Sequence, residues 1–249
     1  MGTDSVLREM STSRDVVVTY IRGMADTQSN GTPPSARTTV HRGAKRADYE
    51  PEKVMAILRA GSVAHVAVST GDGPIVLPMV YGIANNQMYL HGALANGLLK
   101  AGTSQDICAA VTIVDGLVLA KTPFNHSMNY RSVVVRGTAR LVSNEAEILV
   151  ALRAITDHIV PTWDITRPVS ASEIRATRVV ALQLDEMSAK IRTGGPINVA
   201  EDADENYWCG VVPLVTRFES PIANADSVGE VPAEVRGLVG EDLHSFRGR

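Results

Sequence analysis

Two tight-turn sequences early in the chain most constrain its fold. Thr70-Gly71-Asp72-Gly73 and Ala84-Asn85-Asn86-Gln87 are rich in residues that favour hairpin turns. They separate three short apolar runs, at residues 62–69, 74–81 and 88–91, whose composition is typical of strands. Strands joined by such short turns pair in an antiparallel meander, which excludes a parallel βαβ unit here. The first run reads as buried on both faces, so we expect its His65 to be a core histidine.

Helical spacing predicts two flanking helices. Residues 50–60 place apolar side chains on one face, with Pro51 suited to a first helical turn and Gly61 to a stop. Residues 144–158 carry an apolar stripe, and Ser143 or Asn144 can cap the start. A shorter helix is expected at 93–101 and a helical turn at 172–176.

Further strands are expected after the meander, at 106–114, 117–121, 131–142 and 177–184. Asp115-Gly116 reads as a turn between the first two of these. Some six short strands with few helices indicate a mainly β protein with flanking helices, built as a small closed or partly split barrel.

The chain divides into three parts. At 249 residues it suits one domain with appendages. Residues 1–36 end in a polar, proline-containing stretch and are expected to form a flexible N-terminal arm. Residues 37–214 form the predicted domain. Residues 215–249 have little periodicity and are expected to wrap the surface or a partner.

Composition argues against several function classes. The net charge is −3 and aromatic residues make up 4%, which disfavours nucleic-acid binding. No apolar run approaches a membrane span and no signal-peptide pattern is present, so a cytoplasmic location is predicted. Two cysteines are too few for a disulfide framework or a closed zinc site, and we expect no metal. Cys108 is expected to be a buried thiol.

Three elements could converge on a phosphate. The first is the strand-turn-helix at 89–100, where a helix start follows Gly92 and offers Asn96 and Gly97. The second is the stretch 128–132, and the third is Lys190 with Arg192, two apart on one face of an extended chain. Each has a plainer interpretation: an ordinary connection, an exposed loop containing His126, and a solvated surface pair. Trp163 and Trp208 are likewise more often packing anchors than cofactor lids.

Several motifs together resemble a known family. They are Tyr81-Gly82, Tyr89-Leu90-His91-Gly92, Asp115-Gly116-Leu117-Val118-Leu119-Ala120, His126-Ser127-Met128-Asn129-Tyr130-Arg131-Ser132 followed by three valines, and Ser188-Ala189-Lys190-Ile191-Arg192-Thr193-Gly194. Over residues 37–214 the chain resembles the pyridoxamine 5′-phosphate oxidase-like flavin-nucleotide-binding proteins. The nitroimidazole-resistance branch of that family is the nearer one.

The resemblance implies an FMN-binding split β-barrel that is homodimeric, with two FMN sites at the subunit interface. It places the strand containing Val76, Leu77, Pro78 and Tyr81 along the isoalloxazine ring. It implies phosphate contacts from His91, Gly92, Asn96, Gly97 and Lys100. The remaining residues that it implies near the cofactor are Tyr130, Arg131, Ser132, Lys190, Arg192 and Trp208.

One departure bears on the cofactor. Asn96 and Gly97 stand where relatives usually carry a serine and a basic residue, so Lys100, Lys190 or Arg192 would have to supply the charge. The first hypothesis is an FMN-dependent oxidoreductase acting on an unidentified small molecule, with His126 or His91 as proton donor. The alternatives are an F420-dependent reductase and a non-catalytic flavin- or haem-binding protein.

Overall fold

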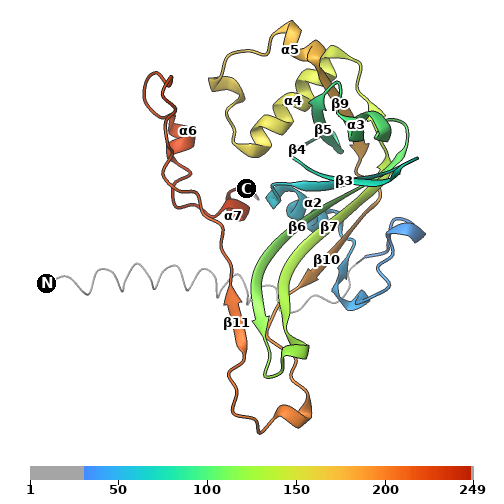
Figure 1. The fold of residues 1–249 in the computed structure, drawn as a ribbon, viewed down its shortest axis with the longest axis vertical. Coiled ribbons are helices and arrows are strands. Elements are labelled where there is room, and N and C mark those ends of the chain that lie inside the picture. The colour runs from blue at the N-terminus through green and yellow to red at the C-terminus, as the bar shows by residue number, and fades with distance from the viewer. Residues whose placement is uncertain (1–30, 248–249) are drawn as a thin grey trace, which may run out of the picture.

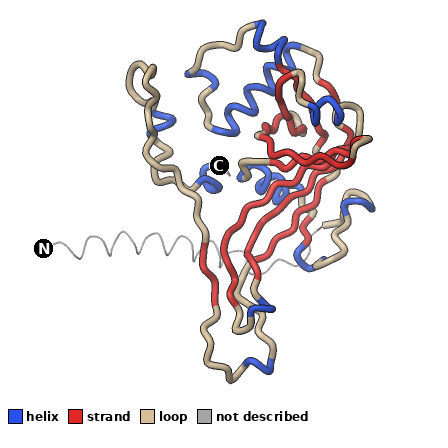
Figure 2. Tube along the Cα trace, in the orientation of Figure 1, coloured by secondary structure: helices blue, strands red, loops and turns tan. Residues whose placement is uncertain are grey.

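The computed structural model describes residues 31–247 of the chain. These residues form two antiparallel sheets with helices packed around them (Figures 1 and 2). The strands are β1 (Ala47–Asp48), β2 (Ala64–Thr70), β3 (Gly73–Met79), β4 (Tyr81–Ala84), β5 (Gln87–Ala93), β6 (Asp106–Leu119), β7 (Ser127–Thr138), β8 (Arg140–Leu141), β9 (Thr177–Gln183), β10 (Met187–Arg192) and β11 (Gly210–Pro213). The expected mainly β fold with flanking helices is confirmed. The strand pairing gives two sheets, with no closed barrel among residues 31–247.

The helices are short except for two. The α-helices are α2 (Pro51–Ala60), α3 (Gly97–Gly102), α4 (Glu145–Ile159), α5 (Ala171–Ala176), α6 (Ala233–Arg236) and α7 (Leu243–Arg247). Single 3₁₀ turns are η1 (Ala36–Thr38), η2 (Ala44–Arg46), η3 (Pro123–Asn125), η4 (Trp163–Ile165) and η5 (Ala200–Asp202). No helix among the described residues is long and apolar enough to cross a membrane.

The larger sheet holds seven strands. Six follow the order β1-β10-β7-β6-β2-β3, and β11 pairs with the far half of β6. Its inner face is a continuous apolar core in which Val66, Val111 and Val133 are fully buried. Helix α2 and the smaller sheet cover this inner face. The predicted meander is confirmed only in part. β2 and β3 pair from Ala64↔Met79 to Thr70↔Gly73, but the middle run, residues 74–81, divides into β3 and β4, which belong to different sheets.

The smaller sheet runs in the order β4-β5-β9-β8 and packs against α4. A Cβ added at Gly82 in β4 would lie 2.3 Å from the backbone nitrogen of Ile155, so only glycine permits this approach. Asn144 caps α4 as expected, accepting a hydrogen bond from the Glu147 N–H at 3.1 Å. Pro51 begins α2, and Gly61 ends it, also as expected.

Four expectations were wrong. The predicted turn at Asp115-Gly116 is a β-bulge inside one long strand, β6. The first meander strand is buried on one face only, so His65 is exposed rather than in the core. Cys108 is half-exposed for the same reason. The strand count is eleven among the described residues, because short strands such as β1 and β8 carry no local signal.

The chain ends lie outside the predicted domain. The expected N-terminal arm, residues 1–36, falls outside the described residues up to residue 30. The C-terminal extension runs back along the molecule and places α7 against α2 (Figure 1). The predicted boundaries at 37 and 214 stay predictions.

Candidate functional site

The outer face of the larger sheet, opposite its core, carries most of the candidate residues. Directly paired residues of an antiparallel sheet project to the same side, so the register defines the rows of side chains on this face. One row runs Pro78, His65, Ala110, Val134, Ser188 across five strands. The adjacent row on one side contains Val76, Ala67 and Cys108, and the adjacent row on the other side contains Thr112, Ser132 and Lys190. We call this surface the outer face.

The outer face is open at the β3 end. β3 is the edge strand, and its outer-face residue Val76 is 57% exposed. Pro74 and Pro78 remove backbone N–H groups from this strand, which discourages pairing with another strand. The result is an apolar ledge beside His65, whose neighbours across the strands, Pro78 and Ala110, are compact. A flat, ring-shaped ligand fits such a surface better than an extended peptide does.

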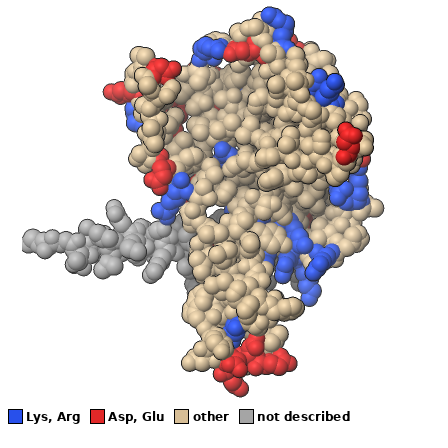
Figure 3. All heavy atoms as spheres, viewed as in Figure 1, with Lys and Arg blue, Asp and Glu red and all other residues tan. Residues whose placement is uncertain are grey.

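The opposite end of the outer face is cationic. Lys190 and Arg192 share one side of β10, as the sequence predicted, next to Ser132 and Tyr130 of β7. The Lys190 ammonium donates to the Arg42 carbonyl at 2.9 Å, and the Ser132 hydroxyl donates to the Lys190 carbonyl at 3.2 Å. Figure 3 shows Lys and Arg side chains gathered on the flank where Figure 1 places the blue segment and β10.

Arg192 is buried without a carboxylate. It is 6% exposed, and its guanidinium donates to the Asn129 side-chain oxygen at 2.5 Å and to the carbonyls of Gly194 and Gly195. Burial, with a smaller contribution from the charge of Arg46, lowers its pKa. A buried cation held only by neutral acceptors is costly, and an anion at this point would offset that cost.

Arg131 differs from its predicted neighbour Ser132. It projects to the other side of β7 and forms an ion pair with Asp115, with a closest distance of 2.7 Å. Asp115 is the extra residue of the β6 bulge, and the bulge aims its carboxylate at Arg131. Of the pair Arg131 and Ser132, only Ser132 therefore lies on the outer face, beside Tyr130.

The predicted phosphate turn before α3 is already capped. The Asn96 side chain accepts from the Leu99 N–H at 3.1 Å, and its Nδ2 atom lies close to Gly92. Gly97 has open space where a side chain would be, and Lys100 is exposed. The position of Gly102 beside Ile107 places α3 at one end of β6.

The three predicted phosphate elements do not meet in one chain. Ile107, beside α3, and Thr112, level with Ser132 and Lys190, are five residues apart on β6, which is about 17 Å along the strand. One phosphate cannot contact both ends. The turn before α3 and the Lys190–Arg192 end therefore form two separate candidate sites.

The two candidate proton donors are also far apart. His91 is half-buried in β5, its Nδ1 atom has no partner, and burial lowers its pKa. His126 is exposed at the β6–β7 connection, where its Nδ1 accepts from the Ala120 N–H at 3.3 Å. From Ile107, near α3, to Val118, near His126, the strand extends about 35 Å.

Tyr81 and Trp208 occupy contrasting positions. Tyr81 is fully buried and donates to the Leu58 carbonyl at 2.5 Å, and its ring packs against the tilted ring of His158 at 4.4 Å between centroids. Burial raises the pKa of its hydroxyl. Trp208 is 67% exposed and precedes β11, beside the far end of β6. Within one chain, neither side chain lies on the outer face near β3.

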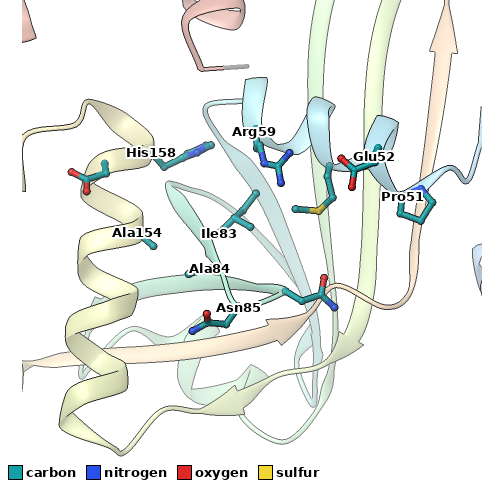
Figure 4. Close-up of a pocket in the computed structure, with 11 residues that line it drawn as sticks. Pro51, Glu52, Arg59, Ile83, Ala84, Asn85, Ala154 and His158 are labelled. Atoms are coloured by element: carbon teal, nitrogen blue, oxygen red, sulfur yellow. The ribbon is translucent and has the colours of Figure 1, made fainter. Parts of the chain in front are cut away.

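A pocket of about 570 Å³ lies elsewhere, between α2, the β4–β5 turn and α4 (Figure 4). Arg59 and Glu52 of α2 reach it from one side and His158 of α4 from the other. It contains none of the predicted cofactor residues. No group of three or more His, Cys, Asp or Glu among residues 31–247 is arranged to hold a metal ion.

Sequence reasoning missed His65 and the basic turn at Arg42, Lys45 and Arg46 as site residues. His65 was assigned to the core because both faces of its strand looked apolar. The basic turn was visible as a cluster of charges, but only the pairing of β1 with β10 places it beside Lys190.

The chain is similar to one protein family and to several solved structures. The family model described as pyridoxamine 5′-phosphate oxidase matches residues 50–191. No curated protein sequence matches the chain. The structure of the flavocytochrome Anf3 from Azotobacter vinelandii is 37% identical, with a TM-score of 0.79, over 84% of this chain and 100% of that one.

A second solved structure, the FAD and heme binding protein from Mycobacterium smegmatis, is 29% identical with a TM-score of 0.75. The match covers 80% of this chain and 98% of that one. The family match spans more than half of the chain and includes β2 to β9 and all of β10 except Arg192. The chain belongs to the pyridoxamine 5′-phosphate oxidase family.

Proposed function

We propose that the protein is a flavin-binding oxidoreductase that acts on a small molecule at the outer face of its larger sheet. The observation that carries the proposal is Arg192, a buried cation with neutral partners only, at the end of a surface whose other end is an apolar ledge. A flavin nucleotide has the matching chemistry, with an anionic tail and a flat apolar ring. Two similar structures, of a flavocytochrome and of an FAD and heme binding protein, support a flavin.

The residues present fit each part of such a ligand. Arg192 and Lys190 would hold phosphate oxygens through charge-assisted hydrogen bonds, with Ser132 and Tyr130 beside them. Val76 and Pro78 would lie against the ring, and exclude water from one of its faces. The flavin, when bound, supplies hydride and electron transfer, while these side chains position it.

His65 adds a proton-handling group to this surface that sequence reasoning did not assign. It is exposed on the outer face, directly across from Pro78. Histidine can hold or release a proton near neutral pH. The predicted roles of His91 and His126 stay predictions, and both would require a second subunit or a long ligand to reach the same ring.

We also propose that the protein is a homodimer. The outer face leaves Val76, Val114 and Thr112 exposed, and the far end of β6 with β11 projects beyond the globular part (Figure 1). A second copy covering this face would bury it and would bring Trp208 or His126 of one copy toward β3 of the other. Thr112→Arg should raise the dimer dissociation constant by at least about tenfold, since it buries an unpaired charge. Sedimentation velocity measures this, and an unchanged association state would contradict the proposed interface.

Haem is a second candidate ligand. The names of the two similar structures include a flavocytochrome and a haem-binding protein, and His65 offers an exposed imidazole among small side chains. Imidazole is a common axial ligand of haem iron. A haem-carrying flavoprotein is therefore the alternative to a protein that binds flavin alone.

The visible spectrum of the purified protein tests both candidates. Flavin absorption and fluorescence released on denaturation are expected. Added NADH or NADPH should bleach the bound flavin, and an electron acceptor should restore its absorption. A Soret band would add haem. A colourless protein that takes up neither FMN nor FAD would contradict the proposed function, whereas one that binds deazaflavin F420 instead would favour that reductase class.

A further inference from the structure

The pocket between α2 and α4 lies along an unpaired strand edge. β4 is an end strand of the smaller sheet and pairs with β5 alone, so among the described residues no strand lies on its other edge. Ile83 and Ala84 of β4 line the pocket, and Figure 4 shows them between the two helices. The pocket of about 570 Å³ therefore combines a sheet edge with a helix on either side, and its volume is typical of small-ligand sites.

The backbone of Ile83 faces this free edge. Asn85 and Asn86 both have a positive φ, of 52° and 57°, as in a two-residue type I′ turn. Such a turn makes Ala84↔Gln87 the hydrogen-bonded pair beside it, so the alternation of the antiparallel ladder leaves Ile83 without hydrogen bonds to β5. The Ile83 N–H and C=O therefore point to the free edge, where neither has a backbone partner among residues 31–247. They are an unused donor and acceptor at the pocket.

Helix α2 adds one cation and one anion to the pocket. Arg59 and Glu52 both line it, and neither side chain forms an ion pair or a hydrogen bond with any residue that the structure describes. The remaining charged side chain in the lining, Asp157, is already engaged with Arg153 at 3.4 Å and with the Trp163 N–H at 3.1 Å. A ligand that carries both a carboxylate and an ammonium matches the two charges that are left.

The spacing of these charges selects the length of the ligand. Arg59 and Glu52 are seven residues apart on α2, which is about 10.5 Å along the helix axis. The ammonium and carboxylate of a single amino acid are joined through one Cα atom, which is too short for this spacing. An extended chain advances about 3.4 Å per residue, so the two ends of a tripeptide are about 10 Å apart. Met55 lines the pocket between the two charges and offers an adaptable apolar contact.

We propose that this pocket binds a short peptide, about three residues long, as an added strand on the free edge of β4. The Ile83 N–H and C=O form hydrogen bonds with the peptide backbone, which is how a sheet edge recognises an extended chain. Arg59 pairs with the C-terminal carboxylate of the peptide, and Glu52 pairs with its N-terminal ammonium. Apolar peptide side chains lie against Met55 and Ala84. The site is separate from the outer face, so the inference does not depend on a bound flavin.

The test uses the full-length protein and the tripeptide alanyl-leucyl-alanine with both termini free. NMR follows the chemical shift and hydrogen exchange of the Ile83 amide. Isothermal titration calorimetry gives the dissociation constants of the free, N-acetylated and C-amidated peptides. The variants are R59Q and E52Q, at exposed positions of α2, and the matched controls R236Q and E201Q remove the same charges from exposed positions elsewhere. Thermal unfolding without peptide checks that each variant folds.

We expect the free peptide to shift the Ile83 amide resonance and to slow its hydrogen exchange at least about tenfold. Amidation of the peptide should weaken its binding to the parent at least about tenfold, but to R59Q less than about twofold, because the carboxylate has no partner in that variant. Acetylation should give the same pattern with E52Q. R236Q and E201Q should bind all three peptides as the parent does.

The peptide backbone provides a second measurement. Successive N–H groups of an extended strand point to opposite sides, so only one of two neighbouring peptide N–H groups can face β4. Of two peptides N-methylated at the second or at the third residue, we therefore expect one to lose binding to the parent protein and the other to keep it.

The inference is overturned if the Ile83 amide does not respond to about 10 mM peptide, or if amidation weakens binding to the parent and to R59Q equally. Equal effects of the two N-methyl groups would exclude strand addition. Loss of self-association in R59Q, measured by sedimentation velocity, would assign the edge to a second copy of the chain instead. A colourless protein that still binds the peptide overturns the flavin proposal alone, so the two proposals fail separately.

Discussion

Arg131 and Arg192 are both buried at one end of the β7–β10 pair, but among the described residues only Arg131 has a carboxylate to balance its charge. Arg131 faces Asp115, whose carboxylate accepts from Nε and Nη2. Arg192 has only amide and carbonyl oxygens. A buried cation with its own carboxylate is neutralised within the fold, whereas one without is available for an anionic ligand. The two arginines of similar burial therefore have different expected roles, structural for Arg131 and ligand-binding for Arg192.

Removing Asp115 tests the structural role. D115A leaves Arg131 buried without its carboxylate, and we expect the free energy of unfolding to fall by about 2 kcal/mol, reduced from the buried-pair range because Asp115 is partly exposed. Urea unfolding measures the change. E201A, at an exposed acid, is the control and should change stability by less than about 0.5 kcal/mol. A D115A protein as stable as the parent would contradict this assignment.

His158 makes stability depend on pH. Burial, with a smaller contribution from Arg247, lowers its pKa to about 4. Above its unfolded pKa, near 6.5, both states are neutral and stability does not depend on this group. Between about pH 6.5 and 4 only the unfolded chain takes up the proton. The free energy of unfolding therefore falls by about 3 kcal/mol as the pH falls through this window.

Urea unfolding at several pH values measures this loss. H158Q should flatten the dependence between pH 6.5 and 4, and H126Q, which changes an exposed histidine, should not. The expectation would be wrong if the two variants and the parent shared one pH profile.

Among the helices and strands, sequence signals within a few residues correctly predicted the features that contacts between neighbouring residues stabilise. The β2–β3 and β4–β5 turns, the start of α2 at Pro51 and the Asn144 cap were all visible in a few consecutive residues. The bulge at Asp115 was not, because β6 continues past it by pairing with β7 on one side and with the distant strand β11 on the other. A Cβ at Gly116 would lie 2.9 Å from the Val212 carbonyl oxygen, so Gly116 serves a strand almost a hundred residues later, not a turn.

Gly82 and Gly97 differ in the space available for a side chain: Gly82 is packed against α4, whereas Gly97 faces open space. G82A would place its methyl carbon within 2.4 Å of α4 backbone atoms, and we expect a loss of about 3 kcal/mol or more, because the helix must shift off β4. G97A has no atom within 4 Å at that position and should change stability by less than about 1 kcal/mol.

Differential scanning calorimetry measures the stability of the G82A and G97A proteins. If G82A were as stable as the parent, α4 would not pack on β4 as closely as the structure indicates. The same G97A protein bears on the predicted phosphate turn. Weaker flavin binding would favour a contact there.

For the whole molecule, the sequence indicated the family and the fold class but not how distant parts meet. Its three phosphate elements were predicted to converge, and strand register keeps two of them about 17 Å apart in one chain. The position of His65 on the outer face follows only from the sheet, which determines which side of β2 is open. Register and face are properties of pairings between residues far apart in sequence, so short motifs cannot fix them.

The C-terminal segment also acts through distant contacts. α7 returns to the ends of α2 and α4, where His244 bonds to the Ala60 carbonyl and Arg247 donates to the carbonyls of Gly61 and Ile159. His158 bonds to the same Gly61 carbonyl at 2.8 Å. The last described residue thus satisfies helix-end carbonyls and places a cation near the Tyr81–His158 pair.

Replacing Arg247 should therefore change both stability and titration. We expect R247L to lower the free energy of unfolding by about 2 kcal/mol, because helix-end carbonyls lose their donor. It should also raise the pKa of His158, because a nearby cation that disfavours imidazolium is removed. The fall in the free energy of unfolding on acidification should then become smaller.

NMR titration of His158 and urea unfolding at pH 7 and 5 measure the two effects. R247K keeps the charge and should leave the His158 pKa lowered, while R236L, on the exposed α6, should alter neither quantity. If R247L destabilised the protein without moving the His158 titration, α7 would contribute packing and hydrogen bonds alone, and the proposed electrostatic link between the C-terminus and α4 would be wrong.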